Sequence, residues 1–122
     1  MYRFYYKDPL LNSLSDTVYL TVLAAHFKAG QGGSNETQRA NATKAVMSYI
    51  QSNVGDDNVI ICGDFNMYKS QEAAYQNLIN HTNSAYNFYD PISKPGVWNN
   101  NSSFAEYHTQ STRSSSTNGG CF

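Results

Sequence analysis

Charged residues are scarce in this 122-residue chain, which has 8 Lys plus Arg against 9 Asp plus Glu and a formal net charge of −1. Without a basic excess the chain has no general field that attracts polyanions, so such a partner would need a local positive patch or a bound cation. Long apolar runs are also missing, and we expect no membrane-spanning segment. The N-terminal residues lack the charged-then-apolar order of a secretory signal.

Cysteines are few as well. Cys62 and Cys121 cannot build a disulfide framework. Cys62 lies in an apolar run, so we expect it to be a small buried residue, with a bridge to Cys121 as the less favoured alternative.

Aromatic residues, by contrast, are plentiful, with 10 Tyr and 6 Phe, which favours a globular single domain over a disordered chain. Many Asn, Ser and Thr with few charges indicate an extracellular or periplasmic protein, and we expect a monomer.

The order of apolar patterns predicts an α/β fold. Three short segments favour strands, namely residues 2–7, 18–25 and 59–62. Nearly every position in the second and third is apolar, which is typical of strands covered on both faces. Strands that alternate with helical segments indicate α/β architecture.

The first helical segment follows a glycine-rich loop. It runs from a cap at Ser34 or Asn35 to about residue 53, with Glu36 in the first turn, where the helix dipole favours an anion. Arg39 falls on the apolar face, so we expect it to bury its stem there and pair with a carboxylate. Residues at three- and four-residue spacing form that face: Arg39, Ala42, Val46, Tyr49 and Ile50.

A second helix is expected after residue 70. Ser70 is its expected cap, and a cap or dipole role suits Glu72 in its first turn. Its packed face consists of Ala74, Tyr75, Leu78 and Ile79. The tail from residue 86 to 122 is irregular and loop-rich, with one possible edge strand at Phe104 and Tyr107.

Residues 63–66 read Gly-Asp-Phe-Asn and follow a short apolar run. They therefore lie where a strand would end, and open α/β folds place ligands at the carboxyl ends of their strands. The Asp64 carboxylate can orient water or accept its proton, and the Asn66 amide can donate to a phosphoryl oxygen. Gly63 permits a sharp turn, and we expect Phe65 to anchor the loop in the core. An ordinary Asx turn is the alternative interpretation.

His26 ends the other apolar strand and precedes the glycine-rich loop. A histidine there can donate to a phosphate oxygen or a leaving group, or it can be a structural residue at a strand end. Lys28 is a candidate phosphate ligand, although a solvated loop lysine is the simpler interpretation. Taken together, His26 and Asp64 favour a catalytic role over a structural one. Two neighbouring strands joined by a helix would each end in a residue that can donate or accept a proton.

This combination resembles the endonuclease/exonuclease/phosphatase superfamily, in its deoxyribonuclease-like branch. The resemblance rests on the strand ending at His26, the helix carrying Arg39, and the strand leading into residues 63–66. It covers about residues 18–82 well and the rest of the chain loosely, in the style of secreted bacterial members. It implies a four-layer α/β sandwich of two packed mixed sheets flanked by helices. The implied activity is metal-dependent hydrolysis of phosphate esters. The favoured enzyme class is a nuclease-like phosphodiesterase, and nucleic acid is one candidate substrate.

The same resemblance assigns roles to individual residues. Asp64 would activate water and serve as a candidate metal ligand, while Asn66 and His26 would contact the scissile phosphate. The implied metal is Mg²⁺, with Mn²⁺ or Ca²⁺ as alternatives.

Two parts of the family pattern have no convincing counterpart in the sequence. They are an early metal-binding Glu and a late Asp-His pair, since neither His81 nor His108 follows an Asp. We therefore expect residues 1–122 to be a truncated single domain that is inactive alone. The alternatives are a non-catalytic, truncated or degenerate binding module of the same fold, and an unrelated α/β domain in which Gly-Asp-Phe-Asn is coincidental.

Overall fold

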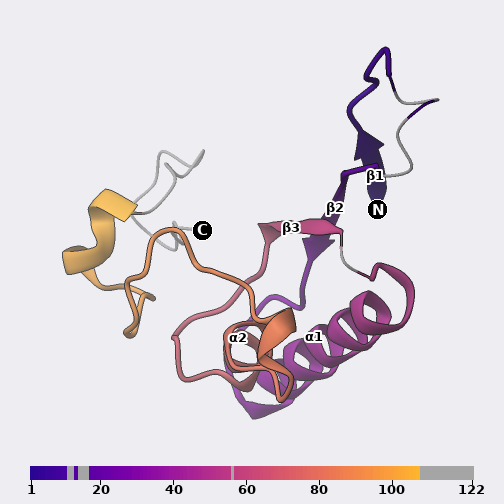
Figure 1. Ribbon diagram of the computed structural model, residues 1–122. Helices are drawn as coiled ribbons and strands as arrows, with labels where there is room; N and C mark the ends of the chain where they lie inside the picture. Colours follow the sequence, from indigo (N-terminus) through magenta and orange to yellow (C-terminus); the bar gives the residue numbers. More distant parts are fainter. Residues whose placement is uncertain (11–12, 14–16, 56, 108–122) are drawn as a thin grey trace.

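The computed structural model describes residues 1–10, 13, 17–55 and 57–107 (Figure 1). Three strands form one mixed sheet in the order β1-β2-β3. They are β1 (Tyr2–Tyr5), β2 (Tyr19–His26) and β3 (Asn58–Asp64). β1 pairs antiparallel with β2, whereas β2 and β3 are parallel and joined through the helix α1. The chain is thus a small mixed α/β fold, as the sequence predicts. His108 and Cys121 lie outside the described residues.

Helices α1 (Gly33–Asn53) and α2 (Ala73–Ile79) pack against each other on one side of the sheet (Figure 1). The caps expected at Ser34 or Asn35 for α1 and at Ser70 for α2 are wrong. Gly32 precedes α1, and its φ of 99° is one that glycine adopts readily. Glu72 is the N-cap of α2, because the Ser70 hydroxyl accepts a hydrogen bond from the Gly96 N–H instead, at 2.9 Å.

The core lies between the helices and the helix-facing side of the sheet. Its buried centre is Met47, Ile50, Val54 and Leu78. Leu23, Val59 and Ile61 pack against this centre from the sheet, and Phe88 packs against it from the tail. The three- and four-residue spacing of apolar residues therefore predicts the position of α1 correctly. Tyr49, however, is 42 % exposed and does not belong to the packed face of this helix. For α2, the expected Ala74 and Leu78 are buried.

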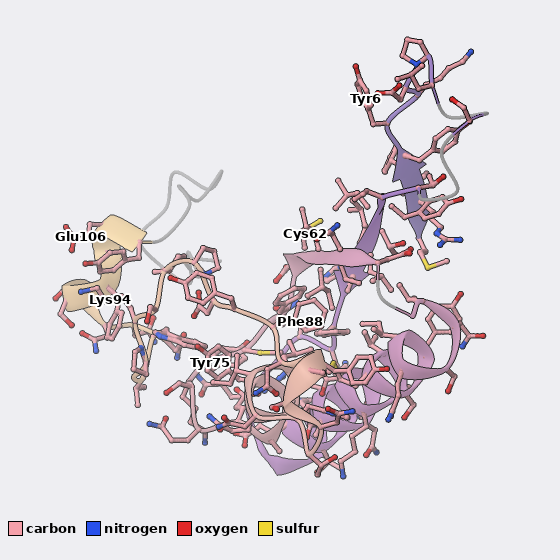
Figure 2. All side chains as sticks on the ribbon, viewed as in Figure 1. Tyr6, Cys62, Tyr75, Phe88, Lys94 and Glu106 are labelled. Atoms are coloured by element: carbon pink, nitrogen blue, oxygen red, sulfur yellow. The ribbon has the colours of Figure 1, made fainter. Side chains whose placement is uncertain are left out.

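The opposite face of the sheet is uncovered among the described residues, which corrects the expectation that β2 and β3 are buried on both faces. Side chains alternate across a strand, so the residues two apart from Leu23 and Ile61 share the helix side and their neighbours share the other. That open face carries Tyr2, Phe4, Leu20, Val22, Ala24, Ile60 and Cys62. Ile60 is 49 % exposed. Cys62 is also exposed rather than buried, on the side of β3 away from the helices (Figure 2).

Between α2 and residue 107, where the described part of the chain ends, the backbone forms two short 3₁₀ helices, Ser84–Tyr86 and Ser102–Tyr107. The second replaces the edge strand expected at Phe104 and Tyr107. The cause is local, since the Asn101 side chain accepts from the Ser103 N–H at 3.2 Å and its carbonyl accepts from the Phe104 N–H at 3.0 Å. These bonds wind the backbone into a turn. Within the described residues no helix has the length and apolar character that crossing a membrane requires.

Candidate active site

The parallel pairing of β2 and β3 brings His26 and Asp64 together. They are register partners at the carboxyl ends of the two strands. The pairing continues one residue further, where the Phe27 N–H donates to the Asp64 carbonyl at 2.9 Å. Both residues follow the alternation of the open face, so the site lies where that face ends. The βαβ connection thus supplies the juxtaposition that the sequence predicts for these two residues.

Gly63 allows the two strands to approach closely at this point. Its φ is 132°, a conformation that side chains disfavour, and a Cβ placed on it would collide with the carbonyl oxygen of Ala25, its partner on β2. Only glycine fits such a close backbone approach. The sequence predicts a turn at Gly63, whereas the structural need is the contact with β2.

His26 and Asp64 are close but not hydrogen-bonded. The His26 Nε2 atom is 3.6 Å from the Asp64 Oδ2 atom, which is too long for a hydrogen bond. The His26 side chain is 75 % exposed and that of Asp64 is 36 % exposed, so both can reach a ligand. A protonated imidazole would attract the carboxylate electrostatically, an interaction weakened by solvent at this exposure.

Asn66 is held beside Asp64 by two hydrogen bonds. Its N–H donates to Asp64 Oδ1 at 3.0 Å, and its side-chain Nδ2 donates to the Phe27 carbonyl at 3.1 Å. The first bond is that of an Asx turn, the alternative interpretation of the motif. Asp64 Oδ2 stays outside this turn, and one of the two Nδ2 hydrogens of Asn66 remains for another acceptor. The turn therefore fixes the positions of the Asp64 carboxylate and the Asn66 amide and leaves each able to bind a ligand.

Two aromatic rings fix the loop below the site. Phe65 stacks on Phe27 with ring centroids 5.4 Å apart, and Phe27 is 8 % exposed. The expected anchoring role of Phe65 is therefore met, although its side chain is only partly buried. Lys28 is exposed. Its carbonyl accepts a hydrogen bond from Arg39 Nη1 at 2.8 Å, which fixes its backbone in the loop after His26.

Comparisons with protein-family models, with curated proteins and with solved structures gave no match. What the site can do is therefore argued from its geometry.

The described residues do not make a complete Mg²⁺ site. No three or more His, Cys, Asp or Glu residues gather around a common point in the described part of the chain. Asp64 offers one carboxylate oxygen, and Mg²⁺ prefers an octahedron of oxygens to which one or two carboxylates contribute. Asp64 thus suits a single ligand position, and we derive no chemical step through a metal.

Glu72 is the residue whose role the sequence misjudged. Its carboxylate is buried and pairs with Arg39 Nε at 2.8 Å, so it does more than complement the dipole of α2. The expectation that Arg39 pairs with a carboxylate is confirmed. The identity of the partner depends on how α1 and α2 pack, and no local pattern gives that.

Proposed function

We propose that this chain carries the water-activating and phosphate-binding part of a phosphate-ester hydrolase, of the nuclease-like phosphodiesterase kind. The observation that supports it most is the meeting of His26 and Asp64 at the carboxyl ends of two parallel strands, 3.6 Å apart. Asn66 stands beside them with a free amide hydrogen. A carboxylate, an imidazole and an amide at one exposed strand edge match what attack of water on a phosphodiester requires.

In the proposed reaction the oxygen of a water molecule forms a bond to phosphorus and the bond to one ester oxygen breaks. Asp64 Oδ2 orients the water and accepts its proton. Asn66 Nδ2 donates to a non-bridging phosphoryl oxygen, where negative charge grows. Protonated His26 donates a hydrogen bond from Nε2 to a phosphate oxygen, and the leaving alkoxide takes a proton from solvent water to become an alcohol. Lys28 adds positive charge to the same side of the site.

The four-layer sandwich is part of this proposal. The open face carries several large exposed apolar side chains, with Tyr2 at 65 %, Phe4 at 52 % and Ile60 at 49 % exposure. A contiguous apolar sheet face of this kind suits packing against a second sheet about 10 Å away. Such a layer would also border His26 and Asp64, because the site lies at the end of that face.

We further propose that activity depends on a divalent cation, Mg²⁺ first, with ligands other than Asp64 supplied from outside the described residues. The test is made on the 122-residue chain and on a version extended by its flanking coding sequence. We expect Mg²⁺-dependent, chelator-sensitive cleavage of plasmid DNA or of bis(4-nitrophenyl) phosphate by the extended version, and little or none by the shorter chain. Robust chelator-sensitive cleavage by the shorter chain would show that it holds a complete site.

The deciding variant is Asp64→Ala in the extended version. Loss of the residue that orients water should lower kcat by roughly 100-fold or more, with circular dichroism unchanged. Glu106→Gln is the matched control, since Glu106 is an exposed carboxylate in the tail (Figure 2) and should leave kcat unchanged. Retained hydrolysis in Asp64→Ala would refute the assignment, whereas no hydrolysis by the extended wild type would favour a binding module without catalysis.

A further inference from the structure

Beneath the site lies a fully buried ion pair. Arg39 on α1 and Glu72 before α2 both have 0 % exposed side chains, and the Arg39 Nε atom is 2.8 Å from Glu72 Oε2. Burying two charges costs several kcal/mol of desolvation per ion, which the attraction between them roughly repays. The pair therefore contributes little net stability. The other hydrogen bonds of Arg39 and Glu72 indicate more clearly what the pair does.

Those further bonds reach both loops of the site. On the β2 side, Arg39 Nη1 donates to the Lys28 carbonyl at 2.8 Å and to the Gly30 carbonyl at 2.9 Å. On the β3 side, Glu72 Oε1 accepts from the Tyr68 N–H at 2.8 Å. The first loop directly follows His26 and the second directly follows Asn66. One ion pair thus joins the two segments that leave the carboxyl edge of the sheet.

Tyr68 closes the connection. Its hydroxyl accepts from the Gly30 N–H at 3.2 Å, and its ring centroid lies 5.3 Å from the Arg39 guanidinium carbon. Arg39 Nη2 is buried without a hydrogen-bond partner among the described residues, and the Tyr68 ring adds a cation–π contact to the guanidinium. The loops are therefore tied to each other as well as to the ion pair.

We propose that Arg39 and Glu72 are positioning residues, which hold the loop after His26 and the loop after Asn66 in the register that the site needs. The expected effect on kcat rests on the proposed function. The positioning of the two loops does not depend on it and can be tested without any activity. Both side chains are buried away from the site surface, and each acts through backbone groups two to four residues after His26 or Asn66. Displacement of a reacting group by about 1 Å can lower a rate roughly 100-fold, so a loop tether of this kind would govern kcat.

The test compares Arg39→Lys, Glu72→Gln and the double variant Arg39→Met/Glu72→Met. Lysine keeps a charge for Glu72 but lacks the planar guanidinium that reaches both carbonyls and Glu72 at once. Glutamine keeps the shape but has only one acceptor oxygen for the two donors. The double variant removes both charges, so it regains a stable core while the hydrogen bonds to the loops stay absent.

Hydrogen exchange followed by NMR gives the structural readout. The Phe27 and Asn66 amides bond to Asp64 and report the site, whereas the Val54 amide, bonded to Ile50 at 3.0 Å, reports the core. We expect roughly tenfold or faster exchange at the two site amides in all three variants, with the core amide unchanged in the double variant. Glu36→Gln is the control, because it weakens a partly exposed ion pair to Lys69, at 3.3 Å, between the same two regions and should change neither readout.

In the extended, active version we expect kcat to fall about 100-fold with KM nearly unchanged, including in the double variant whose stability has returned. A double variant that regains wild-type exchange at Phe27 and Asn66 and wild-type kcat would overturn the proposal, since the pair would then serve stability only. If the wild type hydrolyses no phosphodiester, the exchange rates still decide the positioning role, and only the proposed function fails.

Discussion

Replacing Gly63 by alanine tests the close approach of β2 and β3. At a φ of 132° a non-glycine residue costs about 1–3 kcal/mol of backbone strain. The new Cβ would also collide with the Ala25 carbonyl, and displacing packed atoms costs about another 1–3 kcal/mol. We expect Gly63→Ala to lower the free energy of unfolding by about 4 kcal/mol, a large share of the roughly 5–15 kcal/mol typical of a domain. Urea unfolding followed by circular dichroism measures it.

Two other glycines separate strain from collision. Gly55 has a φ of 64° with no atom near the position of a Cβ, so Gly55→Ala should cost about 1 kcal/mol of left-handed strain alone. Gly33 is equally open and carries no positive φ, so Gly33→Ala should be neutral or stabilise by up to about 1 kcal/mol. A Gly63→Ala variant no less stable than Gly55→Ala would refute the close-approach argument.

Three further predictions follow from exposed or perturbed groups. In a Cys121→Ser variant Cys62 should react with a thiol reagent without denaturant, and labelling only after unfolding would show that the open face is covered. Burial, with the hydrogen bond to Asp90, raises the pKa of Tyr75 to about 12, so its stabilisation is complete below about pH 10 and is lost as the pH rises through 12. A spectrophotometric titration of Tyr75→Phe should lack that last component, and an unchanged curve would contradict the assignment. Arg3 on β1 donates two hydrogen bonds to the Asp57 carboxylate, from Nε at 2.7 Å and from Nη2 at 2.8 Å, and this pairing lowers the pKa of Asp57. Its stabilisation of β1 is therefore present above the ordinary pKa of an aspartate, near 4, and is lost as the pH falls through the lowered value. Loss of β1 amide protection in acid checks this, and full protection there would argue against it.

The backbone of the fold was predictable because its signals are local. Apolar runs and helical spacing indicate strands and helices within a few residues, and a helix between two strands implies the parallel pairing that brings His26 to Asp64. The position of the Gly-Asp-Phe-Asn segment at a strand end follows from the short apolar run before it, whereas its chemistry stays a prediction from residue types.

Features that depend on distant neighbours were not predictable in the same way. An apolar residue such as Cys62 is buried only if another layer packs on its face, and no strand pattern shows whether that layer is present. Glu72 looks like an ordinary first-turn acid until α1 and α2 pack and present it to Arg39. Ser70 is a good cap by type, but the Gly96 N–H engages its hydroxyl. In each case a tertiary contact outweighs the local preference.

A titration with a simple phosphodiester tests whether His26, Asp64 and Asn66 bind phosphate as one site, as proposed. Dimethyl phosphate is added to isotope-labelled protein in the presence of Mg²⁺, and NMR chemical shifts are followed residue by residue. We predict saturable shifts centred on the His26 ring and the Asn66 side-chain amide, and their loss in Asp64→Ala or with a chelator. Saturable shifts that centre on another part of the molecule, or no shifts at these two residues, would contradict the account.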